Sequence, residues 1–181
     1  MRHIEKIVND ITRIYYESGK DAEKYLYKAR KLREKFNSGL AIVYCWFYSV
    51  PQKWVFIEPK IFELARHTKF FDLDLLLNIS PEQIAYILKP VIFYNRIAIQ
   101  LKNFCEAVKE EYCSWDNLAN RLAWESIFVI FEKLRNHGGV RITFKNLAAM
   151  KIIVGNDDDL LILDTHVARV LGINKLEQRR Y

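Results

Sequence analysis

The sequence predicts an all-α fold, and three observations support this prediction. Almost every segment places its apolar residues at helical spacing. Glycine and proline number only 6 and 4 in 181 residues, which leaves few tight turns for a β-sandwich or a β-barrel. Hydrophobic residues make up 51% of the chain, so a packed core is expected and global disorder is excluded. We expect roughly nine or ten helices in one compact unit, because the chain has no repeat and no long linker.

The first helices are predicted at residues 1–18 and 21–36, each with an apolar stripe beside charged residues. The motif Asn37-Ser38-Gly39 is typical of a helix end, and we expect it to end the second helix. Residues 40–50 are apolar on all sides, which indicates a helix at the centre of the core. Pro51 is expected to stop that helix.

Later helices are marked by their capping residues. The motif Ser80-Pro81-Glu82-Gln83 combines an N-cap serine, a proline at the first helical position and a glutamine at the third, as in a capping box. Residues 92–111 follow as a long amphipathic helix. Ser114 is expected to cap the next helical run, and a further helix is predicted at residues 123–135.

The charge balance favours an anionic partner. Lysine and arginine number 28 against 22 aspartates and glutamates, a net charge of +6, which fits a nucleic-acid partner but also a merely basic protein. Three cysteines exclude a disulfide scaffold or a four-cysteine metal cluster, and the four scattered histidines predict no zinc site. No apolar stretch is long enough to span a membrane, so we expect a cytoplasmic protein with no membrane partner.

The segment from residue 134 to residue 173 carries the candidate chemistry. Gly138 and Gly139 lie between two predicted helices, the second running from about Thr143 to Val154. A glycine turn exposes backbone N–H groups, which can hold a phosphate oxygen together with the N-terminus of the following helix. Arg141 lies close by in the sequence. The alternative is an ordinary turn between two helices.

Asp164 follows the apolar run 160–163 and opens another amphipathic helix, so it is a natural N-cap. Capping alone would account for an aspartate there, since it contributes on the order of 1 kcal/mol. A carboxylate held at a helix N-terminus also stays ionised and keeps one direction. It could therefore serve as a base or as an electrostatic stabiliser.

The motif LDTHVARVLGI around Asp164 resembles the helix-hairpin-helix DNA glycosylases of the endonuclease III superfamily, and residues 77–108 are similar to an upstream part of that family. The resemblance covers about residues 40–173 and makes Asp164 the catalytic carboxylate. It implies two helical subdomains that flank a cleft, one of residues 40–135 and one of residues 1–39 plus 136–181. It also implies a monomer in a prokaryotic cytoplasm, associated with the nucleoid, that binds double-stranded DNA containing a damaged base.

Bifunctional members of the family carry a lysine at the start of the second hairpin helix, after a Leu-Pro-Gly signature that this chain lacks. The archaeal GO glycosylases, which remove 8-oxoguanine, share that departure. The segment LRNHGGVRITFKNLAAMKI is similar to theirs and places the family lysine on Lys145, with Lys151 as the rival. The resemblance implies a glycosylase with AP lyase activity that needs no cofactor and no metal, and the cysteine count excludes an iron–sulfur cluster of the endonuclease III type.

Physical chemistry supports Lys145 independently of the resemblance. A helix N-terminus disfavours the ammonium form, and partial burial would lower the pKa of the lysine further. A neutral amine is what a Schiff-base nucleophile requires. The alternative for Lys145 is a solvated surface lysine, and the alternatives for the chain are a monofunctional glycosylase, a glycosylase for another lesion, or a non-catalytic DNA-binding module.

The remaining site predictions concern DNA contacts and the base pocket. Gly138, Gly139, Arg141 and Thr143 are expected to contact DNA. Trp54 resembles an aromatic residue that follows the central helix in the archaeal GO glycosylases, and we predict that it forms a wall of the base pocket. Its alternative is core packing, the ordinary role of aromatic residues, which we assign to the tryptophans at 46, 115 and 124.

Overall fold

The computed structural model describes residues 27–29 and 31–155, and every regular element in these ranges is a helix. This confirms the all-α prediction within the described part of the chain. Helical residues 27–29 and 31–35 come first. They are followed by α2 (Ser38–Trp46), η1 (Phe47–Ser49), α3 (Trp54–His67), α4 (Leu73–Asn78), α5 (Pro81–Leu88), α6 (Tyr94–Tyr112), α7 (Trp115–Trp124), α8 (Ile127–Asn136) and α9 (Phe144–Gly155).

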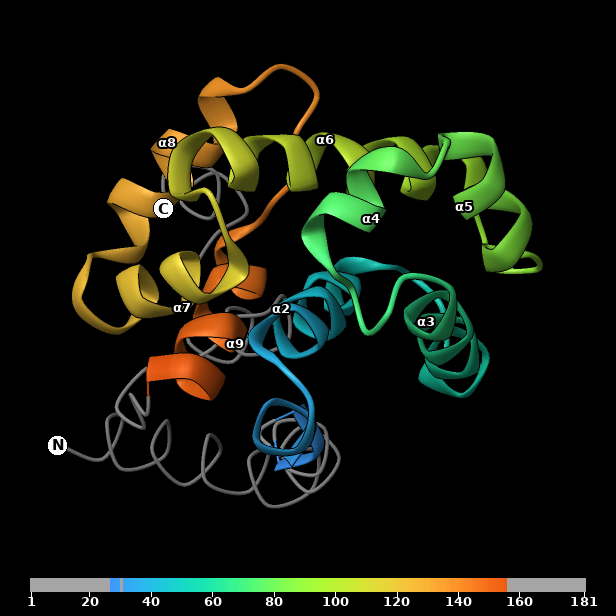
Figure 1. Ribbon diagram of the computed structural model, residues 1–181, viewed down its shortest axis with the longest axis horizontal. Helices are drawn as coiled ribbons and strands as arrows, with labels where there is room; N and C mark the ends of the chain where they lie inside the picture. The colour runs from blue at the N-terminus through green and yellow to red at the C-terminus, as the bar shows by residue number, and fades with distance from the viewer. Residues whose placement is uncertain (1–26, 30, 156–181) are drawn as a thin grey trace, which may run out of the picture.

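Helix α2 lies in the middle of the molecule, with α9 on one side and α3 on the other (Figure 1). All nine of its residues are buried, as the uniformly apolar segment 40–50 predicted. Helix α9 packs against α2, α7 and α8, and the buried residues of α9 include Leu147 and Met150. These two apolar helices therefore form a shared core.

The long helix α6 runs across one side of the molecule and connects two groups of helices (Figure 1). Helices α4 and α5 pack against it, and α3 packs against α5. Helices α7 and α8 also contact α6 and cover α9. None of the described helices combines the length and the apolar character that a membrane span requires.

The motif Asn37-Ser38-Gly39 starts a helix instead of ending one. Asn37 is the N-cap of α2, where its Oδ1 accepts a hydrogen bond of 2.8 Å from the Leu40 N–H. Gly39 lies inside α2, and a Cβ there would come within 2.6 Å of the Trp115 side chain. The prediction of a C-terminal glycine cap was therefore wrong, because this glycine is needed for close packing.

Both predicted capping sites are present. Ser80 and Gln83 form a reciprocal capping box at the start of α5, with hydrogen bonds of 3.2 and 3.0 Å. Ser114 caps α7 by accepting a hydrogen bond of 3.2 Å from the Asn117 N–H. The helix predicted at residues 123–135 begins only at Ile127, after a break between α7 and α8.

Two of the three tryptophans assigned to packing are buried, and one is not. The exposed fractions of Trp46 and Trp115 are 2% and 7%. Trp124 is 90% exposed, so its assignment to the core was wrong. It is the last residue of α7, where the chain turns away from the core.

Candidate active site at the helical hairpin

The glycine turn predicted between two helices is present between α8 and α9. Gly139 has a φ of 81°, a backbone conformation that favours glycine. A Cβ at Gly139 would also overlap the amide nitrogen of Asn103 on α6. At Gly138 a Cβ would meet no atom within 4 Å, so a larger residue would fit there. Both glycines are exposed, so their backbone groups are accessible.

His137, just before the glycines, ties the hairpin to the end of α6. Its Nδ1 lies 2.9 Å from a carboxylate oxygen of Glu110, and its Nε2 lies 2.8 Å from one of Glu111. An imidazolium ring has an N–H donor on each ring nitrogen, so it can form a hydrogen bond with both carboxylates at once. The sequence around His137 gives no sign of these contacts, because the two carboxylates are on another helix, 26 residues or more away along the chain.

Thr143 and Asn146 form a reciprocal cap at the start of α9. The Thr143 Oγ1 accepts a hydrogen bond of 3.2 Å from the Asn146 N–H. The Asn146 Oδ1 accepts one of 3.1 Å from the Thr143 N–H and one of 2.5 Å from its hydroxyl. Thr143 was predicted as a DNA contact, and its hydroxyl has this structural use as well.

Lys145 is the second residue of α9, directly after the hairpin. Its side chain is partly buried, and the described part of the chain contains no partner for its ammonium group. Arg141 lies in the connection before α9 and is exposed. The structure therefore places Lys145, Arg141, Thr143 and both glycines on one short stretch of the hairpin.

Lys151 is differently placed. It lies further along α9, and its Nζ donates a hydrogen bond of 3.0 Å to the backbone carbonyl of Glu125 at the corner between α7 and α8. The Glu125 side chain also accepts from Arg121 and Lys133. Lys151 therefore connects α9 to this corner, a role in holding the fold together.

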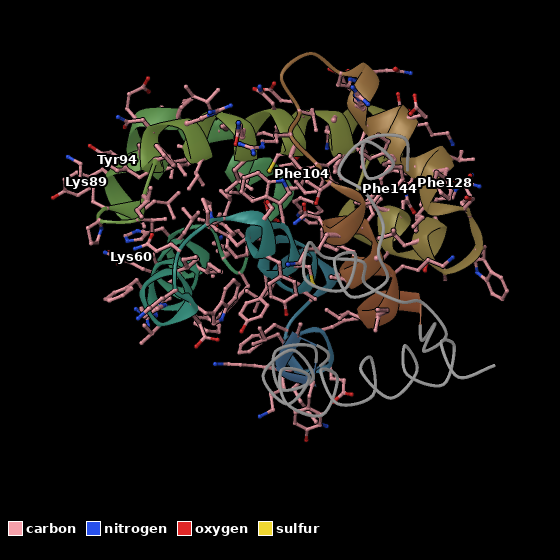
Figure 2. All side chains as sticks on the ribbon, turned by 180° about the vertical axis from the view of Figure 1, so that it is seen from behind. Lys60, Lys89, Tyr94, Phe104, Phe128 and Phe144 are labelled. Atoms are coloured by element: carbon pink, nitrogen blue, oxygen red, sulfur yellow. The ribbon has the colours of Figure 1, made fainter. Side chains whose placement is uncertain are left out.

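Aromatic rings support the first turn of α9 from the side of α8. Phe144 stacks on Phe131 with ring centroids 4.2 Å apart and also contacts Phe128 at 5.0 Å. Figure 2 shows Phe144 and Phe128 side by side. This packing holds the residue next to Lys145 against the other helix of the hairpin.

Asn146 is fully buried, and its amide group reaches a second helix. Its Nδ2 donates hydrogen bonds to the carbonyl oxygens of Cys45 at 3.1 Å and Trp46 at 2.8 Å. These carbonyls belong to the last residues of α2. The spacing Thr143-x-x-Asn146 could have indicated the cap on α9, but no local signal pointed to the contact with α2.

Trp54, the predicted pocket wall, is the first residue of α3 and is partly buried. Its Nε1 lies 3.2 Å from the Tyr44 hydroxyl and 3.3 Å from a carboxylate oxygen of Glu58. Its ring meets the rings of Tyr44 and Tyr48 edge-on, with centroids 5.0 and 5.1 Å away. Trp54 is therefore fixed in one orientation by α2 and η1.

The carboxylate of Glu58 is the centre of this second cluster. One of its oxygens lies 2.5 Å from the Tyr44 hydroxyl and 2.6 Å from the Lys28 ammonium. Burial alone would raise the pKa of Glu58, but the hydrogen bonds from Lys28, Tyr44 and Trp54 outweigh it and lower this pKa. Burial, together with the neighbouring Glu58, raises the pKa of the Tyr44 hydroxyl. Glu58 therefore stays ionised and Tyr44 stays neutral at physiological pH.

Comparison with known proteins identifies the family. Residues 52–179 match the model of the HhH-GPD superfamily of base excision DNA repair proteins. The chain belongs to this family. As an HhH-GPD protein it is a base excision repair DNA glycosylase, and its substrate is DNA. No curated protein and no solved structure matches the chain.

The HhH-GPD match includes all the residues predicted for the site. The hairpin residues and Lys145 are adjacent in the structure, whereas Trp54 lies on α3, beyond α2 (Figure 1). Asp164, the predicted catalytic carboxylate, lies outside the described residues. Among those residues, no group of histidine, cysteine and carboxylate side chains is arranged to hold a metal ion.

Proposed function

We propose that this HhH-GPD protein removes 8-oxoguanine from double-stranded DNA and has AP lyase activity. The main observation that supports the proposal is the position of Lys145 in the structure. It follows the Gly139 turn, lies in the first turn of α9, and has no partner within the described residues. Lys151 is already engaged with the Glu125 carbonyl. The resemblance to the archaeal GO glycosylases supplies the choice of lesion.

DNA docking is assigned to the hairpin. The N–H groups of Phe144 and Lys145 are at the first two positions of α9, where no earlier helical carbonyl is available to them. Together with Gly138 and Gly139 they can donate to phosphate oxygens, and the exposed Arg141 adds a positive charge. Contacts of this kind are independent of sequence and weaken with salt.

The damaged nucleotide is extruded from the stack, at a cost of a few kcal/mol. We assign Trp54 to a wall of the pocket that receives the base, since aromatic rings stack on extruded bases. The division into two subdomains at residues 40–135 and at 1–39 plus 136–181 belongs to this proposal, as does action by a monomer.

The chemistry begins with attack of the Lys145 amine on C1′ of the sugar. The bond from C1′ to the base breaks, and the base leaves with the electron pair. Asp164 stabilises the positive charge that develops on the sugar and assists removal of the proton from Lys145. The sugar ring then opens as the C1′–O4′ bond breaks, and C1′ forms a Schiff base with Lys145. Loss of a proton from C2′ drives β-elimination, which breaks the C3′–O bond and releases the phosphate-bearing strand on the 3′ side of the lesion. These steps use no metal and no organic cofactor.

Borohydride trapping tests the proposal. A duplex containing 8-oxoguanine opposite cytosine is incubated with the protein and borohydride, and the covalent complex is counted on a denaturing gel. We expect a trapped complex from the wild type and from Lys151→Gln, but none from Lys145→Gln. A normal yield from Lys145→Gln would exclude Lys145 as the nucleophile. Base release without trapping would indicate a monofunctional glycosylase, and binding without base release a non-catalytic module.

A further inference from the structure

We propose that Asn146 is a positioning residue for Lys145. It joins the first turn of α9 to the last turn of α2, and so determines where Lys145 lies relative to Trp54. This inference rests on the proposed function, in which Lys145 is the nucleophile and Trp54 a wall of the base pocket. Asn146 itself touches neither substrate nor reacting atoms.

Asn146 uses the whole hydrogen-bonding capacity of its side chain. An asparagine side chain offers two donor hydrogens and one oxygen with two acceptor sites. Both acceptor sites are used by Thr143, and the two donors go to the carbonyls of Cys45 and Trp46. The side chain is fully buried. Four directed contacts allow it a single orientation.

These contacts join the end of α2 to the start of α9. The Cys45 carbonyl also accepts from the Phe47 N–H, and the Trp46 carbonyl also accepts from the Ser49 hydroxyl, so each carbonyl at the end of α2 has a local donor and the Asn146 amide. At its other end, the Asn146 side chain accepts from the N–H and the hydroxyl of Thr143, directly before α9. An apolar residue of similar size would fill the space, but it would remove the hydrogen bonds to α2 and leave the Thr143 N–H without its acceptor. The two helices are therefore joined at one fixed register.

Helix α2 also holds Trp54. Tyr44 directly precedes Cys45 in α2, and its hydroxyl accepts a hydrogen bond of 3.2 Å from the Trp54 indole. Successive contacts thus lead from Lys145 through its neighbour Asn146 and the end of α2 to Trp54. The proposed nucleophile and the proposed pocket wall are fixed to the same helix.

Loss of this connection should reduce the rate of chemistry more than the affinity for DNA. A displacement of about 1 Å can slow an enzymatic step by on the order of 10²-fold, because the reacting atoms no longer meet at the right distance and angle. DNA affinity comes mostly from phosphate contacts. The exposed Arg141 and Gly138, on the hairpin before α9, do not depend on the amide of Asn146.

Asn146→Asp and Asn146→Ser test the proposal. Asp keeps an acceptor for Thr143 but loses both donors to α2. Ser loses them without adding a buried charge, so it is used if the Asp variant fails to fold by circular dichroism. Ser80→Ala is the matched control, since it breaks the capping box of α5, away from the hairpin. The readouts are the rate of borohydride trapping on an abasic-site duplex and the Kd for a duplex with a tetrahydrofuran abasic analogue.

We expect both Asn146 variants to trap on the order of 10²-fold more slowly than the wild type. Their Kd should change less than about threefold, because the phosphate contacts remain. Ser80→Ala should trap at the wild-type rate. A folded Asn146→Ser that traps at the wild-type rate overturns the positioning role, and so does a rate that falls only in proportion to DNA binding. If Lys145→Gln still traps, it is the proposed function that fails.

Discussion

Substitution of Gly139 by alanine should destabilise the hairpin by an amount that the structure allows us to calculate. The φ of 81° places the residue in the left-handed region, where a side chain costs about 1–2 kcal/mol. The added Cβ would also overlap the amide nitrogen of Asn103. This nitrogen is at the end of a flexible side chain, so its displacement adds little. We therefore expect a loss of about 1–3 kcal/mol in the free energy of unfolding.

Urea unfolding followed by circular dichroism measures this loss, with Gly138→Ala as the matched control. Nothing lies within 4 Å of a Cβ at Gly138, so its stability should stay within about 0.5 kcal/mol of the wild type. Adding Asn103→Ala to Gly139→Ala should remove the overlap and leave the backbone cost. Equal unfolding free energies for the two single glycine variants would contradict this prediction, because they would show that Gly139 carries no conformational requirement.

Two further predictions concern the second cluster and the cysteines. The fold lowers the pKa of Glu58, so its contribution to stability is present above the pKa of the unfolded chain and is lost as the pH falls through the folded value. Urea unfolding at a series of pH values should therefore show that the difference in unfolding free energy between wild type and Glu58→Gln shrinks from neutral to acidic pH. A difference that stays constant with pH would contradict this prediction. Among the described cysteines, Cys113 is exposed, whereas Cys45 and Cys105 are buried and burial raises their pKa. Ellman's reagent should label Cys113 in the native protein, while Cys45 and Cys105 should react only after unfolding. Labelling of Cys105 in the folded protein would contradict its burial in the core.

The helices were predictable because their signals are local. The apolar segment 40–50, the capping box at Ser80 and the cap at Ser114 all act over a few residues, and each is present. The misassigned motif Asn37-Ser38-Gly39 consists of residues that suit either end of a helix. Its role was decided by Trp115, which packs directly against Gly39. Trp124 was misassigned for a similar reason, because hydrophobic character does not show whether a helix end faces the core.

The candidate site likewise combines features that the sequence predicts with contacts that depend on helix packing. The order of the glycine turn and Lys145 could be read from the chain, and both are placed as predicted on the hairpin. The sequence could not show that Lys151 donates to a carbonyl of another helix corner. It also could not show that His137 lies between two carboxylates of α6. Contacts of this type depend on how helices pack, and neighbouring residues carry no record of them.

The amino-acid sequence was enough to predict the helical class, the starts of α5 and α7, and the hairpin that carries Lys145, because propensity, capping and glycine turns act between near neighbours. The packing of the helices revealed that Lys151, and not Lys145, is held by a carbonyl of another element, and that Asn146 connects the start of α9 to α2. Asn146 reaches the carbonyls of Cys45 and Trp46 across separations of 101 and 100 residues. Such a contact forms only when α2 and α9 pack together. Packing removes these polar groups from water, so they hydrogen-bond to one another instead.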